Sequence, residues 1–247
     1  MNNSQTIYNK LSSRKGQIAV LIDPEKCDNG SKLLELIRKS EFAGVDYFFI
    51  GGSTVTKNEF DSTVNFLKLN TTIPLVIFPG SYHQVSEKAD ALLYLSLLSG
   101  RNPDFLIGHH VQSASEIYSM DIEVISTGYI LIDGGSKSTV SYISQTTPIP
   151  SHQIGIVRNT AIAGILQGKK VLYFDAGSGA KRPISSEIID EVVTMGVPII
   201  IGGGIRTIEK MIALKNAGVN VIVIGNHIEE NIDFLLDIKS FIASNQN

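Results

Sequence analysis

The chain has 247 residues, of which 43% are hydrophobic and 18% charged, and its formal net charge is -3. This composition excludes a disordered or fibrous protein and is typical of an α/β domain with a buried sheet. The small negative charge leaves no basic stripe for a nucleic-acid backbone, so we expect no nucleic-acid partner.

The N-terminal segment, Met1 to Lys15, is polar and lacks the apolar core of a signal peptide. No later run reaches the roughly 18 apolar residues of a membrane span. We therefore expect a cytoplasmic protein without an integral membrane segment. Cys27 is the single cysteine, which excludes an intramolecular disulfide and a thiolate metal cluster and favours a structural thiol.

Short β-branched runs alternate with longer segments of helical periodicity, a pattern that predicts parallel strands joined by crossover helices. The predicted strands are Gln17–Ile22, Tyr47–Ile50, Leu75–Phe78, Ala91–Leu95, Glu123–Thr127, Val171–Phe174, Pro198–Ile201 and Val221–Ile224. The predicted helices include Ser31–Phe42, Glu59–Leu69, Ile154–Leu166, Ser186–Met195 and Ile208–Ala217. Eight strands favour one closed (β/α)8 TIM barrel over an open doubly wound sheet, so we treat 1–247 as a single domain.

The first two predicted strands end in polar residues. Asp23 follows the first strand and Ser53 follows the second, where a carboxylate and a hydroxyl could share a hard cation such as Mg2+. Each residue also has a purely structural alternative, with Asp23 as a turn or helix cap and Ser53 as the N-cap of the second helix. Lys26, close to Asp23, could contact a diphosphate or lie in solvent.

Two segments in the middle of the chain have uncertain roles. His109 and His110 are adjacent, and adjacent residues on a helix do not face one site, so we expect them to be structural or interfacial. The stretch 133–152 is rich in Gly, Ser, Thr and Pro and is too long for an ordinary connection. We expect a lid-like or ordered excursion there.

Glycine-containing loops follow the last three predicted strands. In a barrel these loops lie on one face, where main-chain N–H groups can converge on a phosphate. A single glycine after a strand indicates only a tight turn, whereas three such loops in series predict a phosphate site. Arg206 could approach that phosphate or pair with a neighbouring carboxylate. The loops are Asp175–Gly179, Gly202–Arg206 and Gly225–Asn226.

The order and spacing of several motifs resemble those of geranylgeranylglyceryl phosphate synthases, with bacterial heptaprenylglyceryl phosphate synthases as close relatives. The resemblance runs over nearly the whole chain. Its motifs are Ile22–Lys26, Gly51–Ser53, Phe78–Ser81, Ser99–Pro103, Gly128–Leu131, Tyr173–Ala180, Gly202–Arg206 and Gly225–Asn226.

The resemblance implies a Mg2+-dependent prenyltransferase that alkylates the C3 hydroxyl of sn-glycerol 1-phosphate with an isoprenyl diphosphate and releases pyrophosphate. Twenty carbons, as in geranylgeranyl diphosphate, is the preferred donor length, and a homo-oligomer, dimer or hexamer, is implied. The family roles carry over to Asp23 and Ser53 as metal ligands. Those around glycerol 1-phosphate carry over to Leu172, Tyr173, Phe174, Asp175, Ala176, Gly177, Ser178, Gly203, Gly204, Gly225 and Asn226.

One position departs from the family pattern. The family usually carries a glutamate after the sixth strand, where this chain has Asp175, shorter by one methylene. If this carboxylate deprotonates or orients the glycerol hydroxyl, backbone position or a bridging water must supply the missing reach. Tyr173 is the second catalytic candidate, because it could contact the glycerol hydroxyls or could be a packing residue.

Two rival functions stay open from the sequence. Similar glycine loops serve barrel enzymes that act on phosphorylated sugars or aminoribotide-like substrates, and fold alone does not fix function. A protein that kept the fold but lost catalysis would bind the phosphate ligand and release no pyrophosphate.

Overall fold

Eight parallel strands form a closed barrel in the structure, a computed structural model that describes residues 6–27 and 30–243. The first five residues of the N-terminal segment considered above lie outside this range. Each strand pairs with the next, and β1 pairs with β8 to close the ring. The predicted TIM barrel is therefore confirmed. The strands are β1 (Gln17–Ile22), β2 (Tyr47–Ile50), β3 (Leu75–Ile77), β4 (Ala91–Leu97), β5 (Glu123–Leu131), β6 (Val171–Asp175), β7 (Ile199–Gly202) and β8 (Val221–Ile224).

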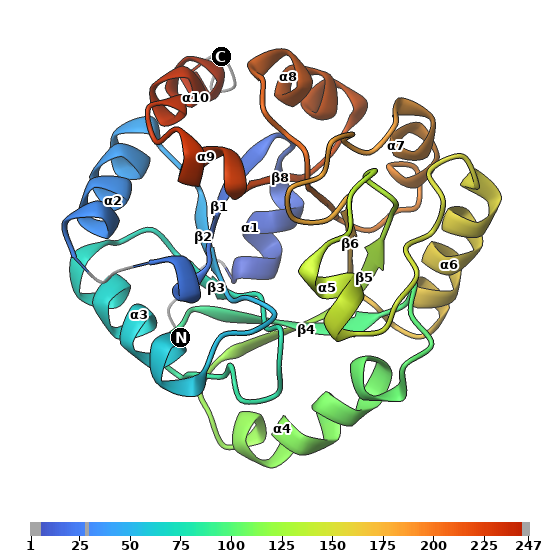
Figure 1. Ribbon diagram of the computed structural model, residues 1–247, viewed down its shortest axis with the longest axis horizontal. Helices are drawn as coiled ribbons and strands as arrows, with labels where there is room; N and C mark the ends of the chain where they lie inside the picture. The colour runs from blue at the N-terminus through green and yellow to red at the C-terminus, as the bar shows by residue number, and fades with distance from the viewer. Residues whose placement is uncertain (1–5, 28–29, 244–247) are drawn as a thin grey trace.

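Helices surround the strands as a ring, with α1 and α5 inside it (Figure 1). None of the described helices is long and apolar enough to cross a membrane. The helices are α1 (Ile7–Ser13), α2 (Ser31–Ala43), α3 (Lys57–Asn70), α4 (His109–Tyr118), α5 (Thr139–Ile143), α6 (Ile154–Leu166), α7 (Ser186–Val192), α8 (Ile208–Ala217), α9 (Asn226–Glu230) and α10 (Phe234–Ala243). A 3-10 turn, Pro24–Lys26, follows β1, and a π-helical turn, Asp104–Gly108, leads into α4.

The strands are buried on both faces because their side chains alternate between two cores. On β6, Val171 and Tyr173 belong to the core inside the barrel, whereas Leu172 and Phe174 pack in the layer between barrel and helices. This explains why the strands appear in the sequence as continuous apolar runs. It also decides which residues of a strand end can reach the inside of the barrel.

Helix α1 packs against the core inside the barrel through Ile7 and Leu11. The Gln17 side-chain amide at the start of β1 donates to the Leu11 carbonyl at 3.0 Å, and the Tyr47 hydroxyl donates to the Gln17 amide oxygen at 2.7 Å. These buried polar groups are satisfied by each other, which fixes α1 across the N-terminal end of the barrel.

Most strand predictions are confirmed, and the errors lie at the ends. Three strands have the predicted bounds, but β4 continues to Leu97 and β5 to Leu131, four residues beyond the predicted end. The predicted β5 stopped before Gly128, because a glycine after an apolar run usually marks a turn. Gly128 instead lies within the strand, where an added Cβ would lie 2.6 Å from a Leu98 methyl carbon. β3 ends one residue early at Ile77, and β7 is shifted by one residue to Ile199–Gly202.

The helix predictions are less complete. Ile154–Leu166 and Ile208–Ala217 are confirmed, while the predicted Ser186–Met195 ends at Val192. Five helices of the structure were not predicted from the sequence: α1, α4, α5, α9 and α10. The stretch 133–152 is ordered, as predicted: it contains α5, and an isolated bridge joins Ile132 to Ile149.

We predict that Glu123→Ala lowers the thermal unfolding temperature. The Glu123 carboxylate accepts hydrogen bonds from the main-chain N–H groups of Ile7 (2.6 Å) and Tyr8 (3.0 Å) at the start of α1. Losing an anionic cap of this kind costs about 0.5–2 kcal/mol. The control is Glu116→Ala, at an exposed site on α4. Equal unfolding temperatures for the two variants in calorimetry would contradict the capping role.

Candidate active site

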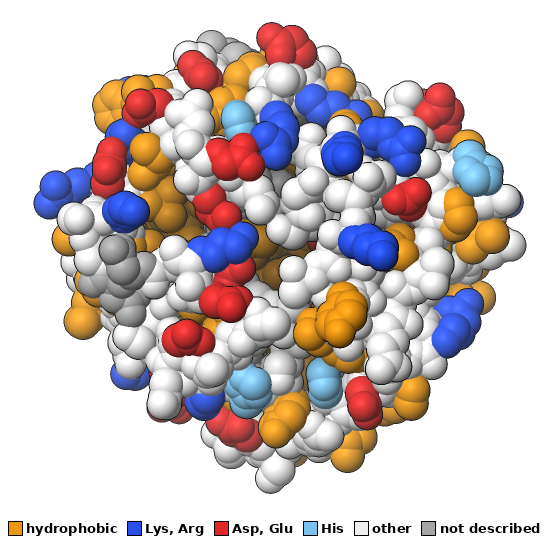
Figure 2. All heavy atoms as spheres, viewed as in Figure 1, with side chains coloured by type: hydrophobic (Ala, Val, Ile, Leu, Met, Phe, Trp, Pro, Cys, Tyr) orange, Lys and Arg blue, Asp and Glu red, His pale blue; other side chains and the backbone are white. Residues whose placement is uncertain are grey.

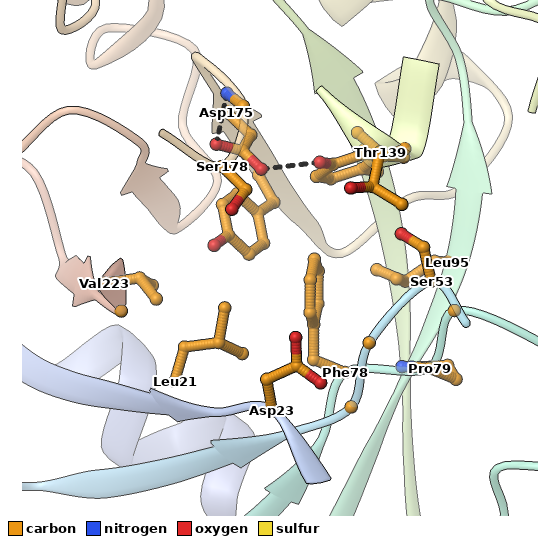
Figure 3. Close-up of a pocket in the computed structure, with 18 of the residues that line it drawn as sticks. Leu21, Asp23, Ser53, Phe78, Pro79, Leu95, Thr139, Asp175, Ser178 and Val223 are labelled. Carbon is orange, nitrogen blue, oxygen red and sulfur yellow. Dashed lines mark hydrogen bonds between the residues drawn. The ribbon is translucent and has the colours of Figure 1, made fainter. Parts of the chain in front are cut away.

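A cavity opens at the C-terminal ends of the strands, and Figure 2 shows this face with a hollow near its middle. Most of the predicted site residues line it, although they come from five different strand ends. Figure 3 shows Asp175 and Ser178 on one side and Asp23 on the other, with Phe78 between them. The predicted residues in the lining are Asp23, Ser53, Tyr173, Asp175, Gly177, Ser178, Gly203, Gly204, Gly225 and Asn226.

Three of the predicted substrate-binding residues do not line the cavity. Leu172, Phe174 and Ala176 are buried in the layer between barrel and helices. The alternation along β6 causes this, since residues two apart point the same way and Tyr173 and Asp175 point inward. A ligand in the cavity could therefore meet these three residues only through their main chain.

Asp175 is held from two directions. The Tyr129 hydroxyl on β5 donates to its Oδ2 at 2.6 Å, and the main-chain N–H of Gly177 donates to its Oδ1 at 2.8 Å. A Cβ at Gly203 would lie only 2.7 Å from Oδ1. The carboxylate therefore fits at this position because Gly203, the residue after β7, has no side chain.

Burial raises the pKa of Asp175, and the hydrogen bonds from Tyr129 and Gly177 partly oppose that rise. Burial, together with the nearby Asp175 charge, raises the pKa of both Tyr129 and Tyr173 well above the ordinary value. Both phenols therefore keep their protons at neutral pH, and Tyr129 is the donor in its bond to Asp175. This arrangement leaves the carboxylate able to accept a proton from a ligand hydroxyl.

Sequence analysis did not identify Tyr129 as a site residue. It lies in β5 directly beside Tyr173 in the strand register, and the two rings meet edge to face with centroids 5.4 Å apart. Tyr129 belongs to the motif Gly128–Leu131, which could have indicated a site residue. The predicted strand ended before that motif, so Tyr129 was not placed beside Tyr173.

The glycine loops after β6, β7 and β8 converge as predicted. Gly203 and Gly204 have φ values of 82° and 70°, which are strained for other residues. The Ser178 hydroxyl donates to the side-chain oxygen of Asn226 at 2.9 Å and joins the first loop to the third. The convergence of the three loops provides the close main-chain approach that a phosphate group requires.

Asp23 and Ser53 both line the opposite side of the cavity. The predicted capping role is found for Asp23 and not for Ser53. Asp23 does cap the 3-10 turn, because its Oδ1 accepts from the N–H of Glu25 at 3.2 Å. Ser53 is not the N-cap of α3, since Thr56 fills that position in a capping box with Glu59. Burial raises the pKa of Asp23 more than the positive charge of Lys26 lowers it.

The donor set on this side suits a hard cation. Among the described residues, no three or more His, Cys, Asp or Glu side chains are grouped to hold a metal. Mg2+ requires few protein ligands and takes its other oxygens from water and phosphate, so one carboxylate and one hydroxyl at the cavity wall suit it chemically. The partly buried Asp23 carboxylate would gain a counter-charge from such an ion.

Among the described residues, the lysine and the arginine that line the cavity, Lys26 and Arg206, are both paired with carboxylates. The Lys26 side chain is 43% exposed, and its ammonium lies 3.0 Å from Glu229 and 3.7 Å from Asp23. Arg206 lies 2.8 Å from Glu230, which bears out the expectation that it pairs with a carboxylate.

His109 and His110 both line the cavity, although adjacent residues on a helix were not expected to share one site. The ring of His110 stacks on Tyr94 with centroids 4.0 Å apart, and its Nε2 is 2.7 Å from the Leu95 carbonyl oxygen. The ring of His109 packs against Phe105.

The part of the cavity near β3, β4 and α4 is largely apolar. It lies apart from the glycine loops and provides space for a hydrocarbon chain beside a polar centre. Sequence analysis did not identify this wall, because its residues come from separate strands and a helix. They include Phe78, Val85, Leu92, Tyr94, Leu95, Phe105 and Ile117.

Comparisons with known proteins agree with this geometry. A family model described as the PcrB family matches residues 11–243. The chain is 50% identical over 241 residues to a geranylgeranylglyceryl phosphate synthase of Chitinophaga pinensis, covering 96% of this chain and 95% of the relative. It is 39% identical over 227 residues to the protein of that name from Thermococcus kodakarensis, covering 91% and 88%.

A solved structure is also similar over nearly the full length. The (S)-3-O-geranylgeranylglyceryl phosphate synthase from Thermoplasma acidophilum, in complex with its substrate sn-glycerol-1-phosphate, superposes with a TM-score of 0.87. The two sequences are 30% identical, and the match covers 97% of this chain and 98% of the other.

We predict that Gly203→Ala destabilises the protein more than Gly168→Ala does. The two glycines have φ values of 82° and 83°, so both substitutions carry a similar backbone penalty of about 1–2 kcal/mol. Only at Gly203 would the new methyl meet the Asp175 carboxylate, since nothing lies within 4 Å of a Cβ at Gly168. Overlap in a packed site adds typically about 1–3 kcal/mol. Equal losses in denaturant unfolding would contradict the close approach.

Proposed function

The chain belongs to the PcrB family, and from this premise we propose that it is a prenyltransferase of ether-lipid synthesis. It joins the C3 hydroxyl of sn-glycerol 1-phosphate to geranylgeranyl diphosphate and releases pyrophosphate. The observation that carries the proposal is the match over 97% of the chain to an enzyme solved with sn-glycerol-1-phosphate. The cavity supports it, with converging glycine loops on one side and an apolar wall on another.

In the proposed reaction the glycine loops hold the phosphate of sn-glycerol 1-phosphate, and Asp175 accepts the proton of the C3 hydroxyl. The hydroxyl oxygen forms a bond to C1 of the prenyl chain while the bond from C1 to the diphosphate oxygen breaks. Pyrophosphate leaves with that electron pair. Tyr173 lines the cavity beside Asp175 and limits where the glycerol can lie. Orientation and a pre-formed polar environment provide most of the rate.

The proposal also includes a metal ion, a location in the cell and an oligomeric state. Mg2+ held by Asp23 and Ser53 would offset the charge that develops on the diphosphate. We place the enzyme in the cytoplasm as a homo-oligomer formed from one domain per chain.

The direct test offers purified protein sn-glycerol 1-phosphate with prenyl diphosphates of several lengths, with and without Mg2+. Ether product and pyrophosphate should form together and should require the metal. Binding of sn-glycerol 1-phosphate without any pyrophosphate would favour a non-catalytic binding protein. Turnover of a phosphorylated sugar or aminoribotide instead would favour another barrel enzyme.

We predict that Asp23→Asn weakens the apparent affinity for Mg2+ at least roughly tenfold, a loss typical even for removal of an outer-shell partner. Asparagine caps a turn as well as aspartate, so the turn after β1 should persist and only the charge is lost. Affinity for sn-glycerol 1-phosphate, measured by calorimetry, should change little. The control is Asp61→Asn, which removes a carboxylate paired with Lys57 on α3. A normal Mg2+ response in folded Asp23→Asn would refute the metal assignment.

We predict that Tyr129→Phe moves the acidic limb of the kcat/KM profile to higher pH. Asp175 must be ionised to accept a proton, so activity falls as the pH drops below its raised pKa. The hydrogen bond from Tyr129 lowers that pKa, and its loss therefore raises the pKa further. Tyr142→Phe, at a site 83% exposed, is the control. An unshifted limb in Tyr129→Phe would mean that Asp175 is not the group that titrates.

A further inference from the structure

Helix α5 presents an apolar surface at the mouth of the cavity. Thr139, Val140 and Ile143 line the cavity, while Tyr142 on the same helix is 83% exposed and Ile143 is 39% exposed. A large aromatic side chain so open to solvent packs little against the residues that the structure describes. Its position beside the entrance points to a partner that meets the protein at the cavity mouth.

Basic residues lie next to α5. Both the Lys181 and Arg182 N–H groups donate to the Gly134 carbonyl at 3.0 Å, which fixes the loop after β6 against the segment leading into α5. Lys137, Lys181 and Arg182 are all exposed. Of these three basic residues, Arg182 has an acidic neighbour, because its guanidinium lies 3.6 Å from the Asp133 carboxylate. Figure 2 shows hydrophobic atoms over α5 and Lys and Arg side chains nearby on the same face.

We propose that this surface, made of Lys137, Tyr142, Ile143, Lys181 and Arg182 and here called the α5 surface, docks on an anionic lipid membrane. The inference rests on the proposed function, because a prenyl diphosphate donor and an ether-lipid product both carry a long apolar chain. An exposed aromatic residue flanked by lysine and arginine matches the boundary between headgroups and acyl chains. Docked in this way, the cavity mouth faces the bilayer, and the chain enters and leaves with little exposure to water.

The charge and size of the α5 surface favour a membrane over a second copy of the chain. Two copies facing each other would bring their three basic side chains together, which opposes association. A stable protein interface also buries about 800 Å2 on each partner, more than five side chains around an open mouth supply. An anionic bilayer surface, by contrast, attracts each basic residue and needs no matching contour.

The experiment is co-sedimentation of the full chain with vesicles of phosphatidylcholine alone and vesicles of equal parts phosphatidylcholine and phosphatidylglycerol. Wild type should bind the anionic vesicles more strongly, and added salt should weaken that binding. Lys181→Glu should reduce binding about fivefold or more for each unit of charge changed. Its control is Lys170→Glu, an exposed lysine at the opposite end of β6.

Tyr142→Ser should also reduce vesicle binding, and Tyr118→Ser, at a site 95% exposed at the end of α4, should not. Equal binding by wild type, Tyr142→Ser and Lys181→Glu would overturn the proposal, as would no preference for anionic vesicles. A change in the solution mass of Tyr142→Ser without a change in vesicle binding would overturn it in favour of an interface between copies.

A soluble assay separates this proposal from the proposed function. Tyr142 and Lys181 do not line the cavity, so both variants should turn over a short, water-soluble prenyl diphosphate at the wild-type rate without vesicles. If the wild-type protein turns over the soluble donor but does not bind vesicles, the docking surface alone is overturned. No turnover by wild type would overturn the proposed function and remove the reason for the docking surface.

Discussion

The position of the Asp175 carboxylate constrains the rest of the site, because three neighbouring strand ends fix it together. β5 supplies the Tyr129 hydroxyl, the loop after β6 supplies the Gly177 N–H, and β7 is followed by Gly203, where any side chain would occupy the same space. A carboxylate held in this way loses little further freedom when a substrate binds. Its place therefore determines where a hydroxyl of a phosphate-anchored ligand must lie.

The barrel register explains how one cavity can serve a charged and an apolar substrate. Parallel strands bring all their C-terminal ends to one face, so the glycine loops of β6 to β8 lie opposite the ends of β1 and β2. Phe78 after β3, Leu92, Tyr94 and Leu95 on β4, and residues of the segment 105–117 that includes most of α4 supply the apolar wall between these polar regions. In the proposed function the reacting centre lies where the polar and apolar regions meet.

The sequence predicted the framework well and the interior of the site less completely. Parallel strands buried on both faces leave continuous apolar runs, and glycines mark the loops that follow them, so both were evident. Tyr129 was missed because its partner Asp175 is 46 residues away and only the β5–β6 register joins them. The π-helical turn before α4 was missed because no residue pattern in Asp104–Gly108 distinguishes it from an ordinary helix start. Such features depend on tertiary geometry.

The charges around the cavity mean that its own cations cannot balance two anionic substrates. Lys26 is paired with Glu229 and Arg206 with Glu230, and these are the lysine and arginine side chains in the described lining. An ammonium that already has a carboxylate partner gives little net attraction to a phosphate, because binding must break or share that pair. The charge of glycerol phosphate must then be met by main-chain N–H groups of the glycine loops, whose dipoles need no counter-ion. In the proposed function the diphosphate lies on the opposite side beside Asp23, where Mg2+ would supply the positive charge that the paired lysine and arginine do not.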